Sequence, residues 1–146
     1  SLTREPAKTV SGLRGQPHTD SDSGTVHAAG VVAFQSMVDD PHHSKDVPGT
    51  VSVHGWWKRG NAKPGTKALV EVSLQAKRNG TWVTVARQRV TVADGGGRGR
   101  RAVAAAKCRS SKQTWFRGQV DVDLIGVWDD RSRPFSRDVS LACSPW

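Results

Sequence analysis

The chain of 146 residues has no tyrosine, one methionine and only two cysteines. It contains no apolar run long enough to cross a bilayer as a helix, so we expect no membrane insertion. Two cysteines are too few for a closed structural zinc site, which needs four ligands. Helical periodicity is almost absent, because Gly, Pro and β-branched residues recur along the chain. These absences favour one compact all-β domain.

Motifs of common catalytic and nucleotide-binding sites are also missing. There is no G-x-S-x-G nucleophile elbow, and the glycine-rich stretch 95–99 lacks the lysine and hydroxyl residue of a P-loop. That stretch could form an anion-binding nest, but we expect a plain connection between strands. The candidate general bases are His18, His27, His42, His43 and His54. No converging set of partners accompanies them, so we expect neither enzymatic activity nor a cofactor.

The two cysteines, Cys108 and Cys143, lie in strand-like segments and predict one disulfide that holds the C-terminal strand. Closing the loop between them would stabilise the fold by roughly 4 kcal/mol in the chain-entropy model. Two buried free thiols are the alternative. Disulfides persist in oxidising compartments, and the chain begins at Ser1 instead of a methionine. We therefore expect a secreted, extracellular protein without its signal peptide; a cytosolic protein with a trimmed methionine is the alternative.

Alternating apolar and polar residues predict a series of strands within residues 26–146. The pair Asn79-Gly80 indicates a two-residue hairpin, because both residues tolerate a positive φ. The strand that follows changes its alternation, which predicts a bulge near residues 86–90. About six strands joined by turns are typical of an antiparallel, immunoglobulin-like β-sandwich. The run 26–38 could be a strand interrupted at Gly30 or a short helix.

Residues 1–25 differ from the rest of the chain in being polar and rich in Gly, Pro and Ser. We expect an extended N-terminal docking tail, with the domain proper at 26–146. Such a peptide can add to an open sheet edge or fill a partner's cleft. Its anchors would be its only large apolar side chains: Leu2, Val10 and Leu13. A disordered spacer is the alternative.

The formal net charge of +9 favours anionic partners, or serves only solubility. Basic residues next to tryptophans suit single-stranded nucleic acid, but the expected export and the lack of a recognition helix argue against that partner. Three of the six tryptophans fall on turns, edges or the terminus, where they could face a protein partner or a glycan: Trp57, Trp128 and Trp146.

Two groups of acidic residues and histidines have possible site chemistry. Asp121 and Asp123 share one face of a strand, either as paired carboxylates or, as we expect, on a solvated face that pairs with arginines. Several metal-binding residue types occupy one loop: Asp39, Asp40, His42 and His43. They could hold a divalent ion. Adjacent histidines point in different directions, so we expect a solvated loop and no metal.

Four segments resemble a family of small secreted proteins of Streptomyces and related actinobacteria: residues 55–58, 95–99, 115–127 and 141–143. The block WFRGQVDVDLIGV is the most specific of these, and the resemblance covers roughly residues 50–146. Many members of that family carry further cysteines near the positions of Lys63 and Lys77, which are absent here.

The best-defined role within this resemblance is the small adaptor subunit of umbrella toxin particles, which are secreted antibacterial assemblies. The resemblance implies that an N-terminal extension inserts into a cleft of a lectin-bearing, trypsin-like subunit. It also implies that the globular body sits on the repeat ring of the large toxin subunit. We therefore expect a non-enzymatic secreted adaptor that bridges protein subunits. The alternatives are a glycan- or cell-wall-binding module and a protease inhibitor that acts through its tail.

Overall fold

The structure is a computed structural model that describes residues 8–10, 22–29, 32–126 and 133–146, with the backbone alone for 8–10 and 27–29. Its regular elements are strands in two antiparallel sheets, as the sequence predicts. One sheet consists of β1 (Lys8–Val10), β2 (Asp22–Ala29), β3 (Val32–Asp39), β4 (His42–His43), β5 (Thr50–Lys58) and β8 (Ala102–Lys107). The other consists of β6 (Lys67–Arg78), β7 (Thr81–Ala93), β9 (Ser110–Leu124) and β10 (Val139–Ser144).

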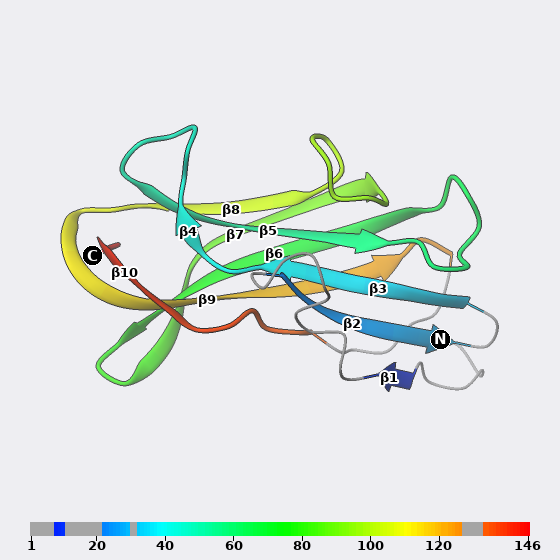
Figure 1. The fold of residues 1–146 in the computed structure, drawn as a ribbon, viewed down its shortest axis with the longest axis horizontal. Coiled ribbons are helices and arrows are strands. Elements are labelled where there is room, and N and C mark those ends of the chain that lie inside the picture. Colours follow the sequence, from blue (N-terminus) through cyan, green and yellow to red (C-terminus); the bar gives the residue numbers. More distant parts are fainter. Residues whose placement is uncertain (1–7, 11–21, 30–31, 127–132) are drawn as a thin grey trace.

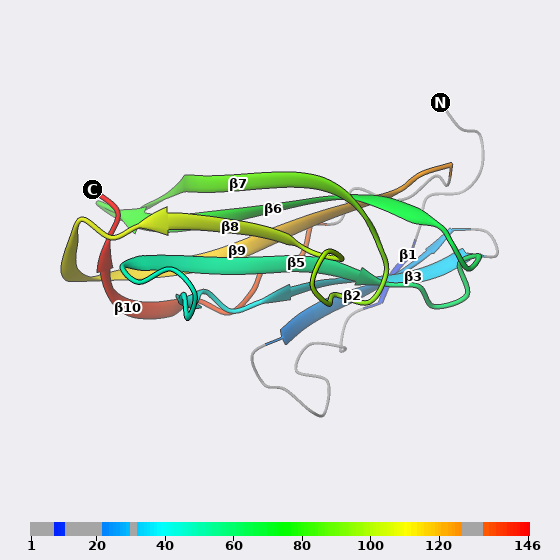
Figure 2. The same cartoon turned by 90° about the horizontal axis from the view of Figure 1, so that it is seen from above.

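The two sheets form the layers of a sandwich (Figures 1 and 2). The strand order in the six-stranded sheet is β1-β2-β3-β5. The short strand β4 also pairs with β5, and β8 pairs with the other side of β5. The four-stranded sheet has the order β10-β9-β6-β7. Strands β7 and β8 of the two sheets lie next to each other, and the Val103 amide of β8 donates a hydrogen bond to Gln88 Oε1 of β7 (2.7 Å). The outermost strands on the other side are therefore β1 and β10.

The hairpin between β6 and β7 confirms the prediction from Asn79-Gly80. Both residues have positive φ angles, 52° and 79°, as a tight hairpin turn requires. The predicted bulge is also present, slightly before the expected range. Leu74 pairs with Ala86 and Gln75 with Thr84, so Val85 is the extra residue. The bulge lets Arg87 and Arg89 lie on the outer face of the sheet.

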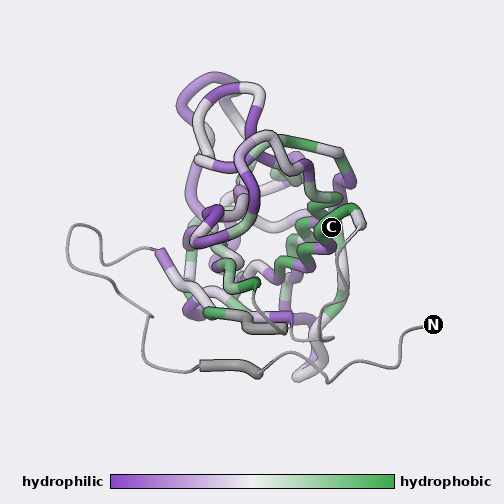
Figure 3. Tube along the Cα trace, turned by 90° about the vertical axis from the view of Figure 1, so that its right-hand side faces the viewer, coloured by the Kyte–Doolittle hydropathy of each residue, from purple (hydrophilic) through white to green (hydrophobic). Residues whose placement is uncertain are grey.

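The core between the sheets is made by the inward-facing residues of β3, β5, β6, β8 and β9. Fully buried side chains include Phe34, Val51, Val53, Trp57, Val70, Val72, Leu74, Phe116 and Val120. Figure 3 looks along the sandwich and shows that the loops protruding at the near end are largely hydrophilic. Among the described residues there is no helix long and apolar enough to cross a membrane.

The N-terminal boundary of the domain differs from the expected one. Strand β2 begins at Asp22, and its residues pair with β3 from Asp22 opposite Asp39 onward. Residues 22–25 therefore belong to the sheet and not to a tail. Strand β1 also lies within the first 25 residues and pairs with β2. Asp22 and Gly24 have little strand propensity, but pairing with a neighbouring strand overrides such local preference.

Candidate functional site

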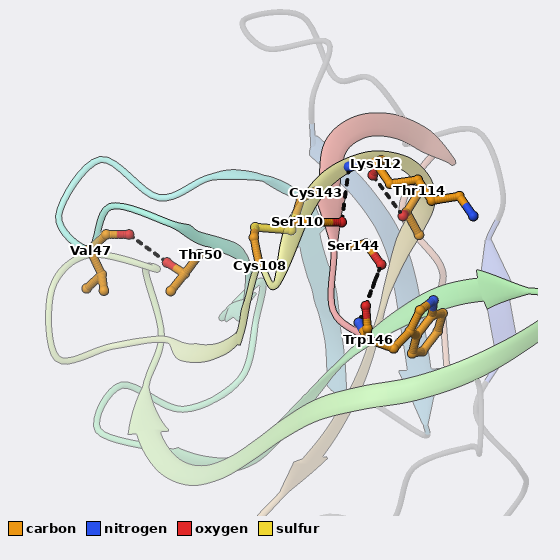
Figure 4. The surroundings of a disulfide bond; sticks show 9 residues. All are labelled: Val47, Thr50, Cys108, Ser110, Lys112, Thr114, Cys143, Ser144 and Trp146. Atoms are coloured by element: carbon orange, nitrogen blue, oxygen red, sulfur yellow. Dashed lines mark hydrogen bonds between the residues drawn. A yellow bond between two sulfur atoms is a disulfide. The ribbon is translucent and has the colours of Figure 1, made fainter.

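The disulfide between Cys108 and Cys143 is present, as predicted, with the two Cα atoms 5.1 Å apart. Cys108 lies where the chain passes from β8 to β9, and Cys143 lies in β10 (Figure 4). Backbone hydrogen bonds support both sides of this link. The Cys108 amide donates to the Gly49 carbonyl (2.7 Å), and the Arg109 amide donates to the Ser144 carbonyl (2.7 Å). The bond thus fastens β10 to the point where the two sheets join.

The prediction that Trp57 faces a partner or glycan is wrong, because its side chain is 0% exposed. Strand β5 extends to Lys58, and the alternation that turns Val51 and Val53 inward also turns Trp57 inward. Its indole Nε1 donates to the Val92 carbonyl (3.2 Å), which satisfies the polar end of the buried ring. The sequence pattern puts this residue on a turn or an edge, whereas the strand continues through it.

The other two predicted tryptophans have different outcomes. Trp128 lies outside the described residues. Trp146 is partly buried, and the guanidinium of Arg78 lies 4.9 Å from the centre of its ring. It lines a pocket together with Lys77, Arg78 and Lys112. One face of Trp146 therefore packs on the protein, and the remainder borders a cationic pocket.

The outer face of the four-stranded sheet carries an exposed aromatic and cationic group that the sequence analysis missed. We call it the aromatic–arginine patch; it consists of Trp82, Trp115, Arg117, Phe135 and Lys77. Trp115 is 51% exposed and Phe135 is 40% exposed. The guanidinium of Arg117 lies 4.4 Å from the ring of Trp82 and 4.1 Å from that of Phe135. Tryptophan and arginine are the residue types enriched at protein-binding hot spots.

A local signal for this patch exists in the sequence. Trp115 and Arg117 share the strand alternation of Asp121 and Asp123, which we expected on a solvated face. The Arg117 Nε donates to Gln75 Oε1 on the neighbouring strand (2.6 Å), and this bond holds the guanidinium between the rings. The alternation therefore predicts that Trp115 faces outward, although the strand pairing that aligns Arg117 with Trp82 is a long-range feature.

The expected outer face beyond this patch is present, and it includes an ion pair. Glu71 lies opposite Asp121 on β9 and opposite Arg89 on β7. Arg133 Nε is 3.6 Å from an Asp121 carboxylate oxygen. Burial raises the pKa of Asp121 above its ordinary value of 3.8, the carboxylate of Asp123 adds to the effect, and Arg133 opposes it. Asp121 thus pairs with an arginine, as we expected for this face.

The predicted anchors of the N-terminal segment are largely outside the described residues. Leu2 and Leu13 are not described, and for Val10 the structure gives the backbone only, in β1 opposite Val26. The role of these three residues in binding a partner stays a prediction.

The predicted loop at residues 39–43 is divided between two environments. Asp40 is buried and binds Arg137, whose Nε lies 2.8 Å from Asp40 Oδ2. His43 is exposed on β4. Asp39 and His42, in contrast, lie beside His54 of β5, a residue that the sequence did not associate with them. Strand pairing brings these three side chains together.

The glycine-rich stretch before β8 packs on a tryptophan. Gly96 has a φ of 84°, and a Cβ atom there would lie 2.5 Å from Cδ1 of Trp56. A glycine is needed at this position both for its backbone conformation and for its close approach to the indole. This contact is consistent with the strand connection that we expected for this stretch.

Comparison with known proteins yields no matching family model, no similar curated protein and no similar solved structure.

Proposed function

We propose that the protein is a secreted, non-enzymatic adaptor that bridges protein subunits of an extracellular antibacterial toxin complex. Its N-terminal segment, residues 1–21, would insert into a cleft of one partner, a lectin-bearing, trypsin-like subunit. The body would contact a second partner, a large repeat-containing toxin subunit. The two roles require a stable body and a segment whose removal does not unfold it.

One observation carries this proposal: among the described side chains, the hydrophobic core has no member before Val32. Within the first 25 residues, the described sheet contacts are backbone pairing of β1 with β2 and of β2 with β3. Strand β1 is the outermost strand of its sheet. A segment that pairs through its backbone at a sheet edge has the chemistry needed to pair with a partner's edge instead.

The disulfide supports the expected compartment. Disulfides form and persist mainly in extracellular, periplasmic and related oxidising environments. Both cysteines of the chain take part in the bond between Cys108 and Cys143. A body held by this link suits an adaptor that must stay folded outside the cell.

The proposal is tested by comparing three purified proteins: the full chain, the chain without residues 1–21, and a chain with that segment scrambled. Each is immobilised and exposed to the purified lectin-bearing subunit with an inactivated protease site. We expect the full chain to bind, and both altered chains to bind at least about tenfold more weakly, a loss of about 1.4 kcal/mol or more. Free peptide 1–21 should compete with the full chain.

Two controls make this result specific. The near-ultraviolet circular dichroism of all three proteins should agree, because the described core lies after the deleted segment. An assay with an active trypsin-like protease separates an adaptor from an inhibitor, since only the inhibitor would slow peptide cleavage. Equal binding by the full and shortened chains would refute the proposed role of the N-terminal segment.

A second candidate function, a glycan- or cell-wall-binding module, is favoured by the exposed ring of Trp115. Exposed aromatic rings offer flat apolar surfaces beside polar groups, and here Gln113 and Arg117 flank the ring on the same strand face. A polysaccharide pull-down with Trp115→Ala distinguishes the two functions. Loss of binding in this variant, with binding retained in Val47→Ala and in the chain without residues 1–21, would favour the glycan module. Val47 is a similarly exposed apolar residue in a different loop.

A further inference from the structure

Three side chains from three different strands meet on the outer face of the six-stranded sheet. Asp39 ends β3, His42 begins β4 and His54 lies in the middle of β5. Val53 and Gly55, on either side of His54, face the core, so the His54 side chain points away from it. Pairing of β3 and β4 with the same strand, β5, brings the three residues together.

The geometry of this cluster is compact. His54 Nδ1 lies 2.7 Å from Asp39 Oδ2, and His42 Nδ1 lies 3.9 Å from the same oxygen. The two imidazole rings are nearly parallel, at 17°, with their centres 5.2 Å apart. One potential ligand atom from each residue falls within 4.8 Å of the other two. No other group of three such residues within the described ranges meets this condition.

Further hydrogen bonds orient the groups before any ligand arrives. The His54 backbone amide donates to Asp39 Oδ1 (2.6 Å), which fixes the carboxylate beside the ring of the same residue. His42 Nδ1 lies 2.8 Å from the Asp40 carbonyl oxygen. A carbonyl can only accept, so this contact makes Nδ1 the protonated nitrogen of a neutral His42 ring and leaves Nε2 with a free lone pair. Histidines that bind metals commonly donate their other ring N–H to such an oxygen.

We propose that Asp39, His42 and His54 bind a divalent late first-row transition-metal ion, of which Zn²⁺ is the best match. Two imidazoles and one carboxylate form a donor set that these ions accept. An ion about 2.0–2.1 Å from two donor atoms requires those atoms to be roughly 3–4 Å apart. One donor atom from each of the three residues lies within 4.8 Å of the other two, so modest rotations of the side chains would bring the three donors around one ion.

The exposure of the three side chains suits an open site. The side chain of His42 is 40% exposed, whereas those of His54 and Asp39 are 18% and 17% exposed. Two ligands are thus held in the surface and the third faces solvent, which leaves coordination positions for water or for a donor group of another molecule. The site is independent of the proposed adaptor function. Its alternative is a hydrogen-bonded Asp–His pair that only ties β3 to β5.

The test is isothermal titration of chelator-treated protein with Zn²⁺, supported by the visible absorption of bound Co²⁺. We compare the wild-type chain with His42→Ala, His54→Ala and the matched control His43→Ala. His43 lies next to His42 in β4 but outside the cluster. We expect one ion per wild-type chain. Binding should weaken at least tenfold in His42→Ala and in His54→Ala, and should change less than twofold in His43→Ala.

Thermal unfolding supplies a second readout. Zn²⁺ should raise the Tm of the wild-type chain and of His43→Ala, because a ligand that binds only the folded state stabilises it. It should not raise the Tm of His42→Ala. His54→Ala could unfold because it loses the bond from its ring to Asp39. In that case the Tm of His42→Ala, at the more exposed position, tests the proposal. No Zn²⁺ binding by the wild-type chain, or equal weakening in the His42 and His43 variants, would overturn the proposal.

Discussion

The two outer edges of the sandwich are fastened by different means. At the edge of the four-stranded sheet, β10 carries Cys143, which is fully buried and bonded to Cys108. At the edge of the six-stranded sheet, β1 and β2 are held by strand pairing. The C-terminal edge is thus a covalently fixed part of the body, whereas the N-terminal edge depends on contacts that can be exchanged.

Buried polar atoms reinforce this contrast. Ser23 Oγ in β2 and Gln35 Nε2 in β3 are both buried, and neither has a hydrogen-bond partner among the described residues. An unsatisfied buried polar group costs about 1–3 kcal/mol. Both atoms lie in the two strands next to β1, on the side of the sandwich that no disulfide holds.

The largest expected effect comes from breaking the fixed edge. The double substitution Cys108→Ala and Cys143→Ala should lower the free energy of unfolding by about 4 kcal/mol, because the disulfide reduces the conformational entropy of the unfolded chain. Urea denaturation followed by tryptophan fluorescence measures this change. Reduction of the wild-type protein should produce a similar loss. A loss below about 1 kcal/mol would mean that β10 is held mainly by its pairing with β9.

A matched pair of glycine substitutions compares the two edges directly. A Cβ on Gly118, in β9, would lie 2.5 Å from Val53 Cγ2 in the core, so Gly118→Ala should lower the free energy of unfolding by about 1–3 kcal/mol. A Cβ on Gly24, in β2, would lie 2.6 Å from Met37 Sδ and 2.8 Å from Gln35 Nε2, both near the ends of flexible side chains. Gly24→Ala should therefore cost less than about 1 kcal/mol, because methionine adapts its shape.

Hydrogen exchange distinguishes a local from a global effect of these substitutions. We expect Gly24→Ala to speed exchange of the β2 amides while the amides of β6 and β9 stay protected, since an edge can open without unfolding the core. Gly118→Ala should speed exchange in all strands alike. Equal effects of the two variants on β6 would show that the N-terminal edge is as integral to the body as the C-terminal one.

Features that depend on neighbouring residues could be predicted from the sequence, whereas features that depend on long-range strand pairing could not. The Asn79-Gly80 hairpin and the sandwich followed from local alternation and turn chemistry, and the disulfide followed from the cysteine count. The prediction for Trp57 was wrong because its strand continues to Lys58, so that the inward alternation reaches Trp57. The meeting of His54 with Asp39 could not be predicted, since it depends on how β3 and β5 pair, which no local pattern encodes.

The smallest expected effect concerns Asp121, on the outer face of the fixed sheet. Burial and the neighbouring Asp123 raise its pKa above 3.8, which means that folding disfavours its charged form. The resulting loss of stability begins as the pH rises through 3.8, the pKa of the unfolded chain. It is complete once the pH exceeds the higher pKa of the folded state, and so it is fully present at neutral pH. Asp121→Asn removes it, so this variant should have a higher Tm than the wild-type chain at pH 7.

The sign of this effect reverses the usual behaviour of a paired carboxylate, which stabilises the fold when it is charged. If the attraction of Arg133 outweighed burial, Asp121→Asn would lower the Tm at pH 7 instead. Scanning calorimetry of both proteins at pH 3 and pH 7 measures the difference, which should shrink at pH 3, where the carboxyl is protonated in both states. Asp46→Asn, at an exposed loop position, is the control for removing one carboxylate. A Tm difference that stays constant with pH would show that the Asn side chain acts through packing, and that the charge on this face is of no consequence for the stability of the fixed sheet.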